Sequence, residues 1–182
     1  MWGRSKRVVR RALRRFGQSQ GGAAAVEFAL VAGPFFFVLG TIAETGLMLF
    51  SEYAIQNSVQ GAAREIRTHQ IATDAGVLLK TAAEFKTDLC QKITSLIDCA
   101  NKVTVYVNSA TTFAGLKTAM PNYLTIGPGG PTSYNPGNSL YAVGVVATYD
   151  WDFAFPLMEF LGNISGGSMR RLHGIAVFSN EP

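Results

Sequence analysis

The sequence predicts an α+β protein in which a long amino-terminal transmembrane helix continues into a domain with a small antiparallel sheet. Residues 28–50 contain no Lys, Arg or Asp and a single Glu. Residues 55–66 carry apolar side chains at the spacing of one helix face. Valines alternate with other residues in the segment KVTVYVN, residues 102–108. The expected parts are a basic leader (1–22), a transmembrane helix (23–50) and an α+β domain (51–182).

The basic side chains are concentrated in front of the apolar run. Residues 1–22 hold seven positive side chains and no acid, whereas the rest of the chain has nine positive and twelve acidic side chains. The seven are Arg4, Lys6, Arg7, Arg10, Arg11, Arg14 and Arg15. Such a cluster places the leader in the cytoplasm and the domain across the membrane. A basic nucleic-acid-binding arm is the alternative, but the acidic balance of the remaining chain argues against a nucleic-acid-binding domain.

The apolar run is long enough to cross a bilayer. Its 23 residues would extend about 34 Å as a helix, and the hydrocarbon core of a bilayer is ~30 Å thick. Pro34 is tolerated in such a helix, although it frees a backbone carbonyl and favours a bend. Glu44 lies near the far end of the run, where a lone carboxylate is costly. We expect Glu44 either to reach the outer interface or to contact a partner helix.

Two helical patterns follow the span. The first predicts that the transmembrane helix continues over 51–70, with a stripe that belongs to the domain core; its members are Ile55, Val59, Ala62 and Ile66. Together with the span, this gives one helix from about Ala24 to Thr68. The second pattern predicts a helix over about 76–96, with apolar residues Val77, Leu78, Phe85, Leu89, Ile93 and Leu96.

Three segments predict strands, at about 102–108, 140–150 and 172–179. The density of Pro and Gly marks residues 121–138 as a loop. We expect an antiparallel sheet of three or four strands with helices on one face. The segment before the last strand is rich in aromatic residues: Trp151, Phe153, Phe155 and Phe160. It is either an edge of the core or an apolar docking surface for the membrane or another subunit.

Cys90 and Cys99 are an even pair in the part of the chain expected outside the cytoplasm. In an oxidising compartment we expect a disulfide, which would add roughly 2–3 kcal/mol of stability on the chain-entropy model. Two residues nine apart on one straight helix are about 13 Å apart, so the bond requires the helix to end near Ser95 and turn back. Two free buried thiols are the alternative, and the spacing does not match a zinc site.

Motifs typical of enzymes are missing from the sequence. It contains no Gly-rich phosphate loop, no HExxH and no GxSxG. His69 and His173 are lone histidines, for which surface or satisfied core positions are expected. We therefore expect a protein that is not an enzyme, with no catalytic residue, metal or cofactor. A membrane-tethered hydrolase is the alternative, because side chains far apart in sequence can cluster in space.

The start of the apolar run carries a pattern of its own. Glu27 stands at its edge, five residues after Gly22. A chain cut after Gly22 would begin at Ala23, and its free amine would lie four residues before Glu27 on the same helix face. Gly22, the following AAAV, Glu27 and Phe28 resemble a prepilin peptidase site, with Gly before the cut, Glu fifth after it and an aromatic residue sixth. The resemblance implies cleavage after Gly22.

A longer resemblance accompanies this motif. Thr41 to Gln70 resembles the TadE-like minor pseudopilins of tight-adherence pili, and the terminal AVFSNEP (176–182) resembles the end of those proteins. The resemblance covers roughly Gly17 to Gln70 and this tail. It departs at Thr45, where an aromatic residue is usual, and at His69, where Gly is usual.

The resemblance implies a pilin-like architecture and a function. The protein would be a minor pseudopilin that is processed by a prepilin peptidase and required for assembly of a tight-adherence (Flp) type IV pilus, and hence for cell adhesion. Its expected partners are the peptidase, other pseudopilins, the major pilin and the inner-membrane assembly platform.

The expected location is the inner membrane, with one pass and a periplasmic domain, or the pilus itself. Glu27, and Glu44 as a second membrane acid, would set subunit register. The alternative is an uncleaved, signal-anchored periplasmic binding or scaffold protein.

Overall fold

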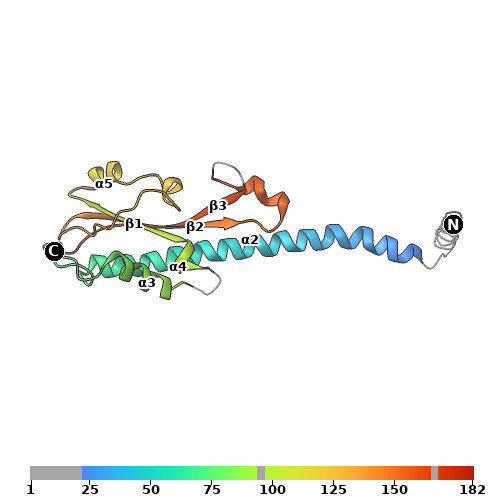
Figure 1. The fold of residues 1–182 in the computed structure, drawn as a ribbon, viewed down its shortest axis with the longest axis horizontal. Helices are drawn as coiled ribbons and strands as arrows, with labels where there is room; N and C mark the ends of the chain where they lie inside the picture. Colours follow the sequence, from blue (N-terminus) through green and yellow to red (C-terminus); the bar gives the residue numbers. More distant parts are fainter. Residues whose placement is uncertain (1–21, 94–96, 165–167) are drawn as a thin grey trace, which may run out of the picture. The chain divides into compact units, whose positions relative to one another are not determined.

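The computed structural model describes residues 22–93, 97–164 and 168–182. The helices are α2 (Ala23–Arg67), α3 (Ala82–Gln91), the single-turn α4 (Cys99–Lys102) and α5 (Phe113–Ala119), with 3-10 turns η2 (Tyr123–Thr125) and η3 (Pro156–Leu161). The strands are β1 (Val103–Ala110), β2 (Ala142–Asp152) and β3 (Met169–Ser179) (Figure 1). The chain divides into two units, Met1–Ala43 and Glu44–Pro182. The expected leader lies outside the described residues, except for Gly22.

Helix α2 follows the sequence prediction closely. It spans 45 residues and contains Pro34. Among the described residues it is the one helix long and apolar enough to cross a membrane, with a mean hydropathy of 1.9 over its most apolar window. Its first half leaves its large apolar side chains exposed, including Phe28, Phe35, Phe36 and Ile42. Its second half buries the predicted stripe, including Ile55, Val59 and Ile66. One helix therefore combines an anchor with a core element.

The second unit is organised around a three-stranded antiparallel sheet with strand order β1-β2-β3. All three predicted strands are present, and their ends differ from the prediction by at most three residues. Val107 pairs with Val145, which pairs with Ala176, and these residues belong to the main core. The alternation predicted from the valines therefore places one face of the sheet against α2.

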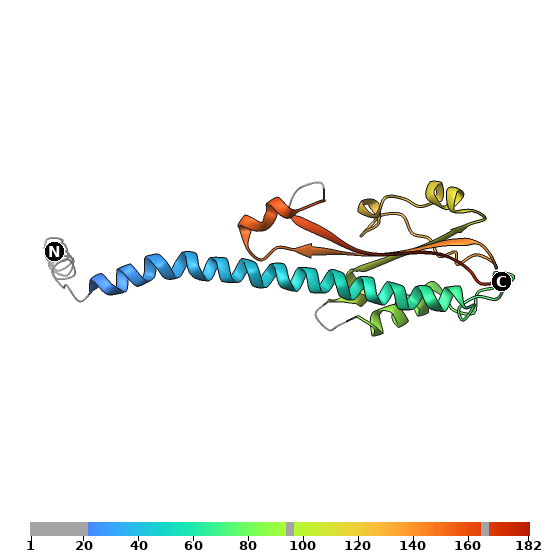
Figure 2. The ribbon, with the colours of Figure 1, turned by 180° about the vertical axis from the view of Figure 1, so that it is seen from behind.

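Both faces of the sheet are covered, whereas the sequence predicted helices on one face. Helices α2 and α3 lie on one side of the sheet and α5 lies on the other (Figures 1 and 2). Tyr106, Val146 and Ile126 form a second, smaller core on the α5 side. The short helix α5 contributes the buried Leu116. A short helix is expected over about 111–120, but nothing in its sequence indicates which face of the sheet it covers.

The predicted helix over about 76–96 is shorter in the structure and begins at Ala82. Gly76 has a positive φ of 78°, and Ala72 forms an isolated bridge with Leu78, so the chain turns before the helix starts. Thr81 then provides a capping box: its hydroxyl accepts from the Glu84 N–H, and the Glu84 carboxylate accepts from the Thr81 N–H. This cap, and not the apolar pattern at Val77 and Leu78, fixes where the helix begins. Ser95 lies outside the described residues.

A disulfide joins Cys90 to Cys99, with the two Cα atoms 5.5 Å apart. Cys90 lies in the last turn of α3 and Cys99 begins α4. The helix ends at Gln91, four residues before the expected end near Ser95, so the two cysteines do not lie on one straight helix. Nearby, the buried Ser58 hydroxyl of α2 donates to the carbonyl of Leu89 at 2.6 Å. The disulfide and this bond fix the end of α3 against the long helix.

Side-chain amides cover the β3 edge of the sheet. The Gln56 amide accepts from the Ile175 N–H at 2.8 Å and donates to the Ile175 carbonyl at 3.0 Å. The Asn163 amide accepts from the Arg171 N–H and donates to the Arg171 carbonyl in the same way. An open strand edge invites pairing with other chains. The two amides bind the edge at Arg171 and at Ile175. They attach β3 to α2 and to the segment after η3.

Candidate functional site

The predicted processing motif lies at the start of α2. Helical structure begins at Ala23, directly after Gly22. Glu27 follows four residues later and is exposed, and the Phe28 side chain is 71% exposed. Within the described residues, Ala23, Glu27 and Phe28 are exposed and Gly22 is partly exposed.

Glu27 is exposed near the start of α2. It forms no hydrogen bond or ion pair with any residue that the structure describes. In the intact chain the nitrogen of Ala23 is a peptide N–H and carries no charge. An ammonium group would arise there only after cleavage, one helical turn before the Glu27 carboxylate.

Glu44 has a role that neither sequence interpretation anticipated. Its side chain belongs to the second unit, and the residue is 6% exposed. One carboxylate oxygen accepts from the Ala154 N–H at 2.5 Å and the other from the Phe155 N–H at 3.2 Å. These contacts attach the segment between β2 and η3 to the first residue of the compact unit. Glu44 thus binds within its own chain, where interface exposure or a partner helix had been expected.

The sequence offered two interpretations of the aromatic segment, a core edge or an apolar docking surface, and different parts of the segment fit each one. Trp151 and Phe153 pack against the main core, and the rings of Tyr149 and Trp151 meet edge to face at 6.5 Å. Phe160 points away from this core and is 80% exposed. The first part of the segment is a core edge, and η3 carries an apolar side chain on the surface.

A buried ion pair supports the neighbouring part of the sheet. The Arg171 guanidinium donates to both Asp150 oxygens, at 2.6 and 2.7 Å, from directly across the β2–β3 ladder. Its remaining amino group donates to the carbonyl of Leu124. The hydrogen bonds that Arg171 donates to the Asp150 carboxylate raise the pKa of Arg171 above its ordinary value. A Cβ on Gly127 would lie 2.3 Å from the guanidinium, so this side chain occupies the space that glycine leaves.

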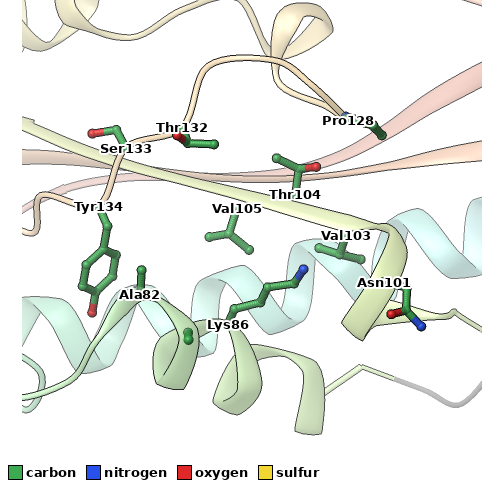
Figure 3. Close-up of a pocket in the computed structure, with 11 residues that line it drawn as sticks. Ala82, Lys86, Asn101, Val103, Thr104, Val105, Pro128, Thr132, Ser133 and Tyr134 are labelled. Atoms are coloured by element: carbon green, nitrogen blue, oxygen red, sulfur yellow. The ribbon is translucent and has the colours of Figure 1, made fainter.

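A groove of about 580 Å³ lies beside β1 (Figure 3). It runs between α3 and the loop before Asn135, with Lys86 and Tyr134 on its walls. The loop covers the β1 edge at one point, where the Val107 N–H donates to the Ser133 carbonyl and the Asn135 N–H donates to the Val107 carbonyl. The groove offers hydroxyls, one ammonium group and apolar walls. The residues that line it include no Asp, Glu, His or Cys.

The two histidines occupy structural positions. The His69 ring contacts the Glu181 carbonyl at 2.8 Å, and its backbone φ is +55°. The His173 ring stacks on Tyr123 at 4.1 Å and lies 3.3 Å from a carboxylate oxygen of Glu52. Within residues 22–93, 97–164 and 168–182, no group of three His, Cys, Asp or Glu side chains is arranged to hold a metal ion.

Sequence reasoning missed several residues that hold the domain to its helix. Gln56 and Asn163 each bind both polar groups of one β3 residue, and Glu44 binds two successive N–H groups. A signal existed for Glu44, because an acid inside an apolar run needs a partner. For the two amides no signal was present, since their partners are backbone groups distant in the chain.

Comparison with known proteins identifies the anchor segment. Residues 22–65 match the model of the family described as TadE-like protein. The match begins at the glycine of the processing motif and covers nearly all of α2. No curated protein and no solved structure matches the chain. The match associates the chain in general terms with tight-adherence pili, and it confirms that the chain carries a TadE-like amino-terminal segment.

Proposed function

We propose that the protein is a minor pseudopilin, cleaved after Gly22 by a prepilin peptidase and required for assembly of a tight-adherence pilus. The observation that carries the proposal is the Gly22–Ala23 pair at the start of an apolar helix that matches the TadE-like family. Cleavage there would remove the seven positive charges and leave the helix in the membrane.

The same features support a location. The basic leader favours a cytoplasmic amino terminus, so that the second unit would lie in the periplasm of a single-pass inner-membrane protein. The Cys90–Cys99 disulfide is consistent with that oxidising compartment. In this location the partners would be the peptidase, other pseudopilins, the major pilin and the assembly platform.

The cleavage step is tested by substitution at the junction. In the native host, Gly22→Ala should leave a larger, uncleaved product, visible on a blot. Gly33→Ala is the matched control. It changes a glycine inside α2, where an added Cβ meets no atom within 4 Å. The control should run at the size of the processed protein. Identical sizes for the wild-type and Gly22→Ala proteins would remove the cleavage step from the proposal.

After cleavage, Glu27 would help to set the axial alignment of neighbouring subunit helices in the pilus. A lone carboxylate near the apolar helix is penalised by desolvation. The new ammonium group of Ala23, on the same or a neighbouring subunit, offsets this penalty. At ~4 Å and an effective dielectric near 20, the gross attraction is about 4 kcal/mol before desolvation is subtracted. A helix packed out of register leaves both charges unpaired, so the pair selects axial alignment.

Glu27→Gln tests this role separately from insertion and cleavage. It keeps the side-chain shape, removes the charge and should still allow membrane insertion, while piliation is impaired. Asp74→Asn is the control, since it neutralises an exposed acid beyond the end of α2. Normal piliation in the Glu27→Gln strain would contradict the register mechanism.

An uncleaved, signal-anchored scaffold protein is the second candidate. It would share the anchor, the topology and the disulfide. It leaves the Gly22 and Glu27 pattern unexplained. The two candidates differ in the mature amino terminus, which is Ala23 for the pseudopilin and Met1 for the scaffold.

A further inference from the structure

The surface of η3 has a feature that pilus assembly does not explain. Phe160 is 80% exposed, although the strands on either side of η3 are well packed. The segment from Phe155 to Leu161, here called the η3 foot, connects the end of β2 to β3. The foot lies at one end of the sheet beside α2 (Figures 1 and 2), and its Phe155 N–H donates to Glu44, the first residue of the second unit.

The Glu44 contacts fix the level of the foot along α2. The carboxylate of Glu44 accepts from the N–H groups of Ala154 and Phe155, which lead directly into η3. Exposed apolar side chains continue on α2 beyond this point, at Leu49 and Phe50. Phe50 lies six residues after Glu44, about 9 Å farther along the helix axis. The foot is therefore attached to α2 at a level where the helix surface is still apolar.

Two polar contacts at the ends of the foot are satisfied internally, while Glu159 beside Phe160 is exposed and would face the headgroups. Carboxylates and peptide N–H groups that face hydrocarbon are costly unless they bind each other. Here Glu44 and two N–H groups satisfy each other. The Arg170 guanidinium donates to the Leu161 carbonyl at the other end of the foot. This side chain combines an apolar stem with a cationic head, which suits the boundary between acyl chains and anionic headgroups.

We propose that the η3 foot inserts into the interfacial layer of the membrane that α2 crosses, with Phe160 as its apolar anchor. The occupant of this surface is lipid, because Glu44 attaches the foot to α2 within the apolar run, residues 28–50, that is expected to cross the membrane. Aromatic side chains are favoured at this depth. The domain is then attached to the bilayer at two points, α2 and the foot, which restricts its rotation about the helix axis. The inference rests on the membrane anchor and is independent of cleavage and pilus assembly.

Site-directed spin labelling of the full chain tests the proposal. The Phe160→Cys protein is labelled with a nitroxide and reconstituted in vesicles of phosphatidylethanolamine and phosphatidylglycerol. The only native cysteines are joined in the disulfide. We expect the label to be accessible to oxygen and several-fold less accessible to a water-soluble nickel chelate than a label at Phe113. Phe113 is 56% exposed in α5, at the opposite end of β2, about 33 Å away by strand length.

Two further measurements separate the alternatives. In the Glu44→Gln background, which removes one of the two acceptor oxygens, the Phe160 label should shift toward the nickel accessibility of the Phe113 label. The Phe113 label should not change. Equal nickel accessibility of the two labels in the wild-type background would overturn the proposal. Protection at Phe160 that disappears when the protein is diluted in lipid would also overturn it, because that result identifies a second protein subunit as the occupant.

Discussion

At the scale of single residues, the end of α2 explains one departure from the family pattern. His69 occupies a left-handed backbone conformation, and the Gln70 N–H donates to the Glu65 carbonyl while the His69 N–H donates to the Ile66 carbonyl. These two bonds define a Schellman motif, in which Gly is the preferred residue at the left-handed position. Glycine is therefore the residue that the backbone conformation at position 69 favours. The contact of the His69 ring with the Glu181 carbonyl offsets part of the strain.

This reading predicts a difference between two truncations of the same side chain. His69→Gly and His69→Ala both lose the contact with Glu181, but only glycine relieves the left-handed conformation. We expect the glycine variant to be more stable than the alanine variant by about 1 kcal/mol. Denaturant unfolding of both proteins in micelles measures the difference. An alanine variant as stable as the glycine variant would show that position 69 is unstrained.

A second residue prediction concerns pH. The Tyr134 hydroxyl is buried without a hydrogen-bond partner in the described structure, and burial raises its pKa to about 12. Because the folded pKa exceeds the ordinary value of 10.0, the neutral form contributes stability below pH 10.0 that is lost as the pH rises through about 12. Tyr134→Phe should increase the free energy of unfolding by about 1 kcal/mol at neutral pH, since it removes an unsatisfied hydroxyl.

The pH dependence of that variant provides its own check. The stability of the wild-type protein should fall more steeply between pH 10 and 12 than that of Tyr134→Phe, as followed by near-ultraviolet circular dichroism. Phe85 packs on the Tyr134 ring with a centroid distance of 5.5 Å, and this contact remains in the variant. Parallel alkaline transitions in the two proteins would mean that the hydroxyl is not buried.

At the scale of elements, the closest contact between α2 and the sheet depends on a glycine. A Cβ at Gly174 would lie 2.9 Å from both the Cα of Gln56 and the carbonyl oxygen of Ile55. Both atoms belong to the helix backbone, so no side chain can move aside. Gly174→Ala should therefore destabilise the protein by roughly 1–3 kcal/mol, because α2 must move away from β3.

The matched control for this prediction is a glycine of α2, the helix that Gly174 contacts. An added Cβ at Gly46 meets no atom within 4 Å. Gly46→Ala should be neutral or stabilising by up to about 1 kcal/mol, since alanine restricts the unfolded helix segment more than glycine does. Thermal unfolding of the two variants beside the wild-type protein compares them. A Gly174→Ala protein as stable as wild type would contradict the tight helix–sheet contact.

These elements also show how far the sequence could predict the fold. The extent of α2, the number of strands and the face of the sheet that packs on α2 follow from local periodicity. The start of α3 was predicted too early, because the apolar residues Val77 and Leu78 imitate helical spacing while the cap at Thr81 decides the boundary. The partners of Glu44 lie 110 and 111 residues away in the chain, where no local pattern can indicate them.

At the scale of the whole molecule, charge and hydropathy divide the chain into parts with different tasks. The leader carries the positive charge, α2 carries the apolar anchor, and the second unit carries the sheet and the disulfide. Removing the leader would reverse the sign of the net charge without touching a buried residue of the second unit. The chain is thus arranged so that cleavage can change its amino terminus and leave the fold intact.

The mature amino terminus tests the central claim most directly. The protein is purified from membranes of its native host and its intact mass and amino-terminal sequence are measured by mass spectrometry. The account predicts a chain that begins at Ala23 and lacks the arginine-rich leader. A chain that still begins at Met1 would contradict cleavage after Gly22 and favour the uncleaved scaffold protein.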